Sequence, residues 1–370
     1  MPGRGAPPLL ARTHGFGLYG CLSQTGAARR PSYVAGSRPV SGLCAEIIRE
    51  QDALEGLEAP WWRLWSQCIS ATPFQSPAWL LPWWQAFMPG DLAVVAVWSG
   101  TDLVGLAPLY LERHASGSRL LPIGISLSDY LDILCMPGQA AAVNAAIAGA
   151  VLRLEWSSWI LPDLPPEAAC SSLALPDAVE SLSASHAACP VLPLTCDETL
   201  ASLVPARRRR QLRRAWRAAQ RRGSVIIRRC ETDPETFLDH LIRLHGSRWA
   251  GQGGGVLADP CAVKFHRTAL PRLAANGLAR CWLMEIGEAV VGAYYGFHHR
   301  GRAYAYLGGF DPGYAEESPG AILIGEAIAE AVHEGAREFD FLRGRESYKY
   351  GWGAVDRWTQ QRVWTRSAPS

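Results

Sequence analysis

The chain has 370 residues, a length that predicts two domains rather than one. Hydrophobic residues make up 48% of it and charged residues 19%, and a formal net charge of +2 argues against a protein whose whole surface binds polyanions. No run reaches the roughly 18 uncharged apolar residues of a membrane span. The ten cysteines form no C-x-x-C pair, so reduced thiols, no metal and a cytoplasmic location are expected.

Residues 1–45 differ in composition from the rest of the chain. They contain no Asp or Glu, and their Gly, Pro, Ser and Arg content gives no periodic apolar face. We predict a disordered leader, because such a segment cannot bury enough apolar surface to offset the entropy of ordering. It lacks the apolar stretch of a secretory signal, whereas a transit peptide and a start codon placed too far upstream are alternatives.

The first half of the chain predicts helices and a hairpin. Ordered structure is expected from Glu46, with helical apolar spacing over 47–67. The runs LAVVAVW (92–98) and LVGLAPLYL (103–111) predict two strands joined by a Ser-Gly-Thr-Asp turn. The Ala-rich run 139–152 predicts a buried helix.

A second hairpin is expected far downstream, from CWLMEI (281–286) and AVVGAYYGF (289–297), followed by a third strand over 303–310. Both hairpins carry Val-Gly at the same point of the second strand. This weak repeat predicts two related halves, 46–195 and 196–370, divided within a Pro-, Ser- and Ala-rich stretch. We expect their sheets to pack or abut, with residues 90–112 outside the sheet of 281–310.

The second half continues with a helix and a strand. Ser318 is a candidate N-cap, Pro319 suits the first helical position and Gly335 suits the C-terminal end. REFDFL (337–342) then alternates like a strand.

The helix start is the first candidate site. Backbone N–H groups over Ser318, Gly320 and Ala321 would bind an anion such as the pyrophosphate of coenzyme A, and a glycine there lets a phosphate approach closely. An ordinary capped helix is the alternative.

The second candidate is the polar run DFLRGRESYKYGWG (340–353), which follows a strand and is too polar to pack wholly in a core. Acylation of an amine needs a base, donors for the oxyanion and an acid for the leaving group. Asp340 or Glu346 could be the base and Tyr348 or Tyr350 the acid. A structural ion-pair network that includes Arg343 and Lys349 is the alternative.

Three further segments are candidates for binding. RRRRQLRRAWRAAQRR (207–222) has nine arginines and no acid, so it predicts a basic helix for RNA, an anionic membrane surface or an acidic glycan, against a merely solvated helix. Arg248 and Trp249 precede a glycine-rich loop and could hold a charged substrate. Asp129 lies in the small acidic cluster LSDYLDIL, where a turn or capping role is the alternative.

The run FDPGYAEESPGAILIGEAIAEAVHEGAREFDFLRGRESYKYGWG resembles the acetyltransferase group of the GNAT superfamily that includes the CelD-type cellulose biosynthesis proteins. The resemblance extends through LHGSRW, KFH, VVGAYYGF, TPFQSPAWLLPWWQAF and LVGLAPLYLER, and thus covers about 70–366. It implies an α/β fold with mixed sheets, built as two tandem GNAT-like domains distantly related to Fem-type aminoacyltransferases.

The resemblance also implies an acyl-CoA donor, such as acetyl-CoA, and an amine acceptor linked to exopolysaccharide or cell-envelope synthesis. The positions that match its motif are Asp340, Arg343, Gly344, Glu346, Tyr348 and Lys349, with Arg248 and Trp249 upstream. The GNAT pyrophosphate signature R/Q-x-x-G-x-G/A is not kept, since 317–321 reads ESPGA with one glycine.

Three functions follow. The leading one is an acyl-CoA-dependent N-acyltransferase acting on an envelope or exopolysaccharide precursor. The second is a Fem-like aminoacyltransferase that takes its donor from aminoacyl-tRNA bound by Arg207–Arg222. The third is a non-catalytic component of a polysaccharide synthesis complex, which the crowded run after the 337–342 strand disfavours.

Overall fold

The first element of the computed structural model, which describes residues 42–177, 179–195 and 199–366, is a strand, β1 (Leu43–Ile48). Its alternate residues face inward and pair with β3 (Val94–Ser99), so the two-residue period decides against the helix expected from residue 47. Helices begin only at α1 (Gln51–Gly56) and α2 (Glu58–Gln67). The leader predicted over 1–45 extends too far, because residues 43–45 belong to β1, whereas residues 1–41 lie outside the described residues.

The N-terminal half (42–195) continues with an aromatic helix, a series of short strands and a buried helix. Its remaining elements are η1 (Pro73–Gln75), α3 (Pro77–Phe87), β2 (Asp91–Leu92), β3, β4 (Asp102–Ala107), β5 (Leu109–His114), β6 (Gly117–Pro122), β7 (Leu134–Cys135), α4 (Ala140–Val151), β8 (Ser158–Leu164), η2 (Ala169–Ser172) and β9 (Val179–Pro193).

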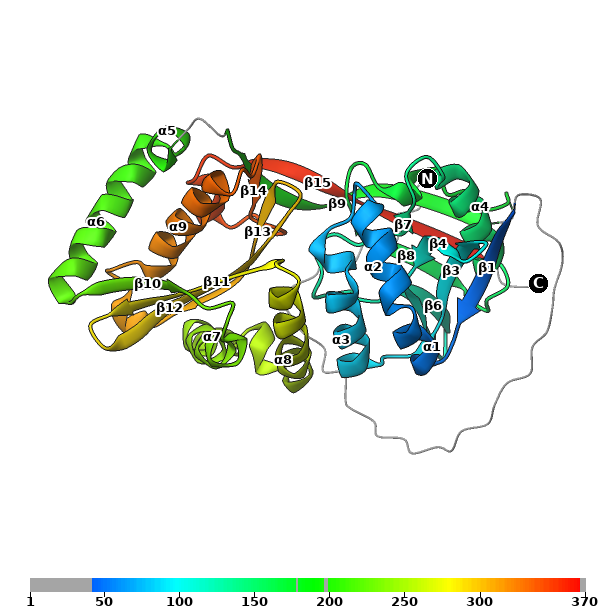
Figure 1. The fold of residues 1–370 in the computed structure, drawn as a ribbon, viewed down its shortest axis with the longest axis horizontal. Helices are drawn as coiled ribbons and strands as arrows, with labels where there is room; N and C mark the ends of the chain where they lie inside the picture. Colours follow the sequence, from blue (N-terminus) through cyan, green and yellow to red (C-terminus); the bar gives the residue numbers. More distant parts are fainter. Residues whose placement is uncertain (1–41, 178, 196–198, 367–370) are drawn as a thin grey trace, which may run out of the picture. The chain divides into compact units, whose positions relative to one another are not determined.

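The C-terminal half (199–366) has longer strands, with α7 and α8 on one face of its sheet and α6 and α9 on the other (Figure 1). Its elements are α5 (Leu200–Leu203), α6 (Ala206–Arg222), β10 (Val225–Arg229), α7 (Pro234–Trp249), α8 (Pro260–Ala275), β11 (Ala279–Ile286), β12 (Ala289–His299), β13 (Arg302–Phe310), α9 (Pro319–His333), β14 (Glu338–Asp340), α10 (Ser347–Tyr350) and β15 (Val355–Arg366), with three short 3-10 turns. Among the described residues, no helix is long and apolar enough to cross a bilayer.

The two hairpins repeat each other in detail, as the shared Val-Gly predicts. Val97 pairs with Gly105 and Met284 with Gly292, and in both hairpins the register shifts at the next residue, which leaves the valine before the glycine in a bulge. A Cβ on Gly105 would collide with Val143 of α4, and one on Gly292 would meet Leu323 of α9 at 2.9 Å. Both glycines therefore let a helix cross the sheet closely.

The expectation of separate sheets is wrong. β1-β3-β4-β7 form one sheet, but β2 and β5 join an eleven-stranded sheet of order β10-β11-β12-β13-β14-β9-β15-β8-β6-β5-β2. The segment 103–111 is two strands, because Pro108 has no N–H and interrupts the ladder.

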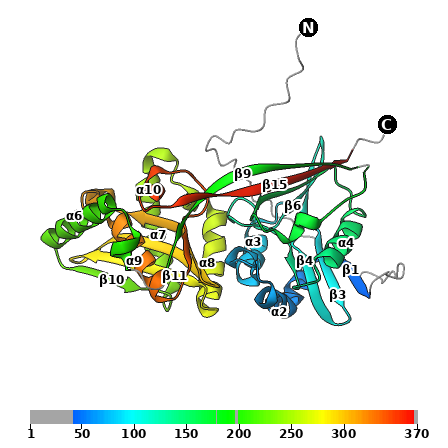
Figure 2. The same cartoon turned by 90° about the horizontal axis from the view of Figure 1, so that it is seen from above.

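The halves exchange their last strands. β9 follows β8 but pairs with β14 of the other half, and β15 follows β14 but pairs with β8. Between these ends β9 and β15 pair with each other over Val179–Val191 and Val355–Arg366, side by side in both views (Figures 1 and 2). The Pro-, Ser- and Ala-rich stretch around residue 180 is thus a long strand.

A continuous apolar core crosses the junction of the halves. Trp79 of α3 packs edge to face on Phe265 of α8 (4.7 Å between ring centroids) and on Tyr306 of β13 (5.2 Å). Such aromatic burial stabilises the junction in addition to the strand pairing.

The helix predicted after residue 318 is confirmed as α9, with Gly335 in a left-handed conformation (φ 76°) beyond its end. Ser318 is the N-cap residue, as predicted, but its side chain makes no capping hydrogen bond. It has φ 50°, and its hydroxyl turns back toward Ala315 O (3.4 Å).

Candidate functional site

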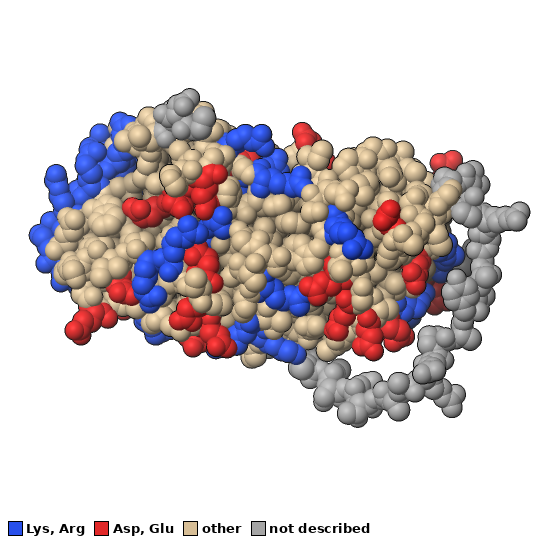
Figure 3. All heavy atoms as spheres, viewed as in Figure 1, with Lys and Arg blue, Asp and Glu red and all other residues tan. Residues whose placement is uncertain are grey.

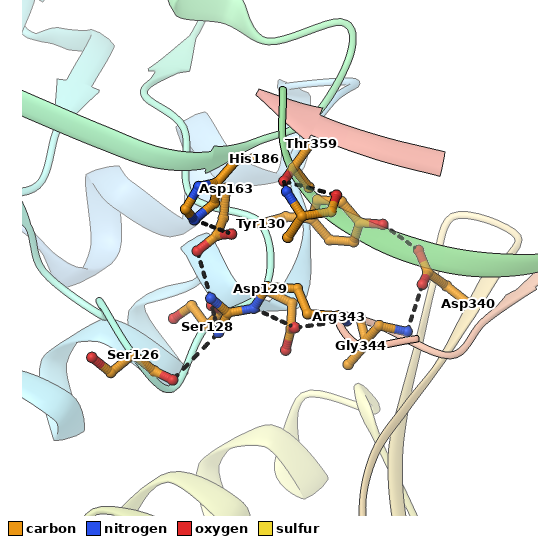
Figure 4. Close-up of polar contacts among 12 residues, drawn as sticks. Ser126, Ser128, Asp129, Tyr130, Asp163, His186, Asp340, Arg343, Gly344 and Thr359 are labelled. Carbon is orange, nitrogen blue, oxygen red and sulfur yellow. Dashed lines mark hydrogen bonds and ion pairs between the residues drawn. The ribbon is translucent and has the colours of Figure 1, made fainter. Parts of the chain in front are cut away.

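The loop after β14 contacts the N-terminal half through Arg343 (Figure 4). Its Nε donates to Asp129 Oδ1 (2.8 Å), its Nη1 to Asp163 Oδ2 (2.6 Å) and its Nη2 to Ser128 O (2.9 Å). The Arg343 backbone N–H also donates to Asp129 (3.0 Å). The side chain of Asp163 is 2% exposed, so this guanidinium neutralises a carboxylate that has almost no access to water.

Asp340 lies beside this network and is fully buried. Tyr130 Oη donates to its Oδ2 (2.6 Å) and the Leu342 N–H to its Oδ1 (2.7 Å). Burial raises the pKa of Asp340 to about 6, against the opposing effect of these hydrogen bonds. Since it has no exposed surface, Asp340 holds the loop against the N-terminal half and is out of reach of a substrate in this conformation.

Lys349 is occupied in the same way. Its buried ammonium donates to the carbonyls of Leu342 (3.1 Å), Arg343 (2.8 Å) and Gly344 (3.2 Å), and pairs with the exposed Glu346 (3.0 Å). Three donors meeting three carbonyls close the loop into a fixed turn.

Backbone strain gathers around the same contacts. Ser126, Asp163 and Leu342 have positive φ (77°, 55° and 58°) without being glycine. Residues in such conformations cost about 1–3 kcal/mol each and persist where the surroundings hold them. The Arg343 and Asp340 contacts supply that restraint.

A second group of the candidate residues meets at the start of α9. The Arg248 guanidinium lies over the rings of Trp249 (5.3 Å) and Phe310 (5.6 Å), and a Cβ on Gly320 would touch Phe310 at 3.8 Å. Burial, with a contribution from the Glu346 carboxylate, raises the pKa of Tyr348 to about 12. The Arg248 guanidinium acts in the opposite direction, so Arg248 lies within electrostatic range of the Tyr348 phenol. Trp249 Nε1 is buried without a partner among the described residues.

The strand that leads to this point is open on one side. β13 pairs with β14 only over Arg302–Tyr304, so residues 305–310 have no strand neighbour there among the described residues. At the helix start, the amides of Ala321 and Ile322 bond to Ser318 O, and Pro319 has none. Among the described residues, the Gly320 N–H has no partner and can donate outward, a smaller anion site than expected for Ser318–Ala321.

The two groups are linked by Tyr306 on β13. Burial and the Asp129 carboxylate raise its pKa and Arg343 lowers it, so its phenol lies within electrostatic range of that ion pair. An open strand edge thus has an aromatic and cationic end at Arg248 and an acidic end at Asp129.

The site contains residues that the sequence analysis did not single out. His186 Nε2 lies 3.4 Å from Asp163 Oδ1. Both residues are far from any motif in the sequence, so no sequence pattern pointed to them. His245 and His266 lie in LHGSRW and KFH, but a single histidine is usually a packing residue, and their role depends on what faces them. Within the described ranges, no group of three or more His, Cys, Asp or Glu side chains is placed to hold a metal.

Residues 206–350 match the model of the acetyltransferase (GNAT) domain. No curated protein sequence matches the chain. Among solved structures, FemX is similar with a TM-score of 0.58 at 11% identity, over 82% of this chain and 95% of that one. The C-terminal domain of a putative lysylphosphatidylglycerol synthetase from Agrobacterium fabrum gives 0.52 at 9%, over 85% and 92%.

A conserved protein of unknown function from Bacteroides thetaiotaomicron VPI-5482 gives 0.53 at 12% identity, over 83% of this chain and 97% of that one. At these identities the likeness concerns the fold alone. The mixed α/β architecture is that of two tandem GNAT-like domains, and residues 206–350 are the part that matches the GNAT acetyltransferase model.

Proposed function

We propose that this protein is an N-acyltransferase of the CelD type, which transfers an acyl group from acyl-CoA to an amine of an envelope or exopolysaccharide precursor. One observation carries the proposal. Within the GNAT-matching region, the unpaired edge of β13 (305–310) runs to the start of α9 at Gly320.

The chemistry of coenzyme A suits this edge. Its pantetheine arm has two amides, which can pair with free backbone groups as an added strand does. Its pyrophosphate then reaches the Gly320 N–H and the Arg248 guanidinium, two donors of the kind that anions require.

The residues near that donor divide into reacting and supporting groups. Tyr348 is the acid for the leaving thiolate, because Tyr350 is occupied with Asp356 (2.8 Å). Asp340, Arg343 and Lys349 position the loop that carries Tyr348. The acceptor amine approaches from the other end of the edge, next to the Asp129–Arg343 ion pair.

Calorimetric titration of the full chain with acetyl-CoA tests the proposal. We expect one site per chain. Gly320→Asp should weaken binding at least tenfold, because the new carboxylate repels the pyrophosphate while Phe310 leaves room for it. Gly149→Asp, which adds the same charge in open space on α4, should bind as the wild type does. No binding to the wild type would overturn acyl-CoA as the donor.

A second candidate, an acyl donor carried on RNA, is favoured by the outer face of α6. Six of its nine arginines are exposed and have no acidic partner among the described residues, and at about 100° per residue they fall within one third of the helix circumference. They are Arg207, Arg210, Arg213, Arg214, Arg217 and Arg221. Figure 3 shows this basic edge.

The opposite face of α6 is packed, through Leu212, Ala215 and Ala219. The remaining arginines have partners: Arg208 donates to Tyr348 O (3.0 Å), Arg209 to Ala201 O, and Arg222 pairs with Glu317 (3.2 Å). Because the apolar face is covered by protein, the helix cannot insert into lipid, which favours a phosphate polymer over a membrane.

Binding of unfractionated tRNA at increasing salt tests this second candidate. Arg210, Arg214 and Arg217 changed to Glu should weaken binding and reduce the salt slope by about two to three. The same change at Arg49, Arg63 and Arg153, which are exposed in the N-terminal half, is the control. If tRNA binding had the same salt dependence in both triple variants, α6 would be a solvated helix without a role in RNA binding.

A further inference from the structure

Four side chains between α7, α8 and the β12–β13 hairpin have buried polar atoms without a partner among the described residues. These atoms are His245 Nε2, both ring nitrogens of His266, Tyr295 Oη and Trp249 Nε1. His245 is 4% exposed, and His266 and Tyr295 have no exposed surface. Buried polar groups are normally hydrogen-bonded, so a group of unpartnered ones at one place indicates a function.

His245 differs from the others because its second nitrogen is fixed. Its Nδ1 lies 3.2 Å from Gly308 O, and a carbonyl can only accept a hydrogen bond. The proton of the neutral ring is therefore on Nδ1, and Nε2 carries the free lone pair. This is the arrangement of an imidazole prepared to accept a proton.

The ring lies at the open edge of β13. Asp311 N–H bonds to Val291 O on β12, so by strand alternation Gly309 faces β12, while Gly308 and Phe310 direct their backbone groups toward the open side. His245 thus holds a carbonyl of the same edge on which the acyl donor is proposed to lie. One turn later, Arg248 covers Phe310.

A glycine loop covers Nε2. Gly253, Gly254 and Gly255 all have positive φ (80°, 81° and 73°), and a Cβ on Gly255 would lie 2.5 Å from His245 Nε2. Only glycine allows the backbone to rest on the imidazole in this way. The loop therefore covers this nitrogen, and it must move aside for a substrate to reach Nε2 from this side.

We propose that His245 is the general base of acyl transfer and that its Nε2 accepts the proton of the attacking amine beneath the 253–255 loop. The inference rests on the proposed acyltransferase function. Burial lowers the pKa of His245, with a further contribution from Arg248, so the ring is neutral at pH 7. Glu346, the other candidate base, is exposed and paired with Lys349.

The step balances as follows. The amine enters uncharged, its nitrogen bonds to the acyl carbon, and its proton passes to Nε2. The C–S bond breaks with its electron pair on sulfur, and Tyr348 supplies the proton of the thiol. Nε2 releases its proton to solvent and Tyr348 regains one, so amine and thioester become amide and thiol.

Imidazole ¹H–¹⁵N correlation spectra of the full chain test the tautomer without any turnover. We expect His245 to show a protonated Nδ1 and an unprotonated Nε2. The opposite tautomer would overturn the inference, whatever the activity.

Transfer from acetyl-CoA to a panel of amines, with glucosamine and hydroxylamine among them, tests the role. His245→Asn keeps an N–H for Gly308 O and removes the lone pair, so kcat should fall about 100-fold or more, with added imidazole restoring part of it and acetyl-CoA binding unchanged. Gly255→Ala, which keeps the imidazole but places a methyl group against Nε2, should also lower kcat. His240→Asn, on another face of α7, is the control.

The outcomes separate the two proposals. A wild type that neither binds acetyl-CoA nor acylates any amine contradicts the proposed function and this inference with it. A wild type that acylates an amine while His245→Asn retains its rate overturns the inference alone.

Discussion

The two halves follow one plan but are interrupted differently. In the C-terminal half, β12 and β13 are continuous over Ala289–Phe310. In the N-terminal half the first of these strands is divided at Pro108 into β4 and β5, and the second is divided by residues 123–133 into β6 and β7. Both halves keep the parallel contact to the next strand, β6 to β8 and β13 to β14.

The insertion 123–133, together with Asp163 of β8, is what the N-terminal half contributes to the site. It carries Asp129 and Tyr130, which hold Arg343 and Asp340 of the other half. The region next to α4 is closed instead, because Asp132 accepts the amides of Ala169 and Cys170. We infer that one half serves as scaffold and the other keeps an open strand edge for a ligand.

Removing Arg343 should have the largest effect on stability. Arg343→Met leaves Asp129 and Asp163 without their cation and should lower the free energy of unfolding by about 3–5 kcal/mol, as measured by urea denaturation. Arg345→Met, exposed on the same loop, should leave the free energy of unfolding nearly unchanged, because exposed ion pairs add little to stability. A stable Arg343→Met protein without turnover would make Arg343 a reacting group rather than a tie between the halves.

Asp340 should make stability depend on pH. Its folded pKa of about 6 lies above its ordinary value of 3.8, so the folded state binds this proton more tightly. Stability from this group therefore rises as pH falls from about 6 to 4, by roughly 2–3 kcal/mol in all. Asp132, with a pKa of about 6 in the N-terminal half, acts in the same window.

Denaturation of the wild type and of Asp340→Asn between pH 4 and 7 isolates this contribution. The free energy of unfolding of Asp340→Asn should rise less between pH 7 and pH 4 than that of the wild type. The part of the rise that comes from Asp132 should be the same in both proteins. Parallel curves would show that Asp340 is not desolvated as the structure has it.

Gly105 and Gly292, which hold equivalent places in the two hairpins, test whether only the C-terminal half binds the acyl donor. Gly105→Val and Gly292→Val each push a helix away from its sheet and should cost about 1–3 kcal/mol. Only Gly292→Val should weaken acetyl-CoA binding, because α9 and not α4 begins at the open edge. Equal loss of binding in both variants would remove the distinction.

Tyr348→Phe should have the smallest effect on stability, within about 0.5 kcal/mol, because the residue is 38% exposed and its hydroxyl has no hydrogen-bond partner among the described residues. Turnover should still fall tenfold or more if it protonates the leaving group. Tyr350→Phe is the matched control, which loses a bond to Asp356 and some stability but keeps its rate. If Tyr350→Phe lost turnover and Tyr348→Phe kept it, Tyr350 would be the acid and Tyr348 would not.

Local patterns predicted much of the C-terminal half. Alternation and turn chemistry locate β11, β12 and β13, and Pro319 and Gly335 mark the ends of α9. The exchanged strands could not be predicted, because the first part of β9 is polar and exposed and its partner β15 is more than 160 residues away.

The candidate site was predicted only in part for the same reason. The polar run after β14 was found, but Arg343 contacts Asp129 and Asp163, which are 214 and 180 residues distant. The free lone pair of His245 follows from Gly308 and Gly255, which no spacing in the sequence relates to it.

Amide hydrogen exchange with and without acetyl-CoA tests the central claim most directly, since it asks which half holds the donor. The account predicts new protection at Gly308, Phe310 and Gly320, on the open edge and the start of α9, and none at Leu134, Cys135 or the start of α4. Protection confined to the N-terminal half would contradict it.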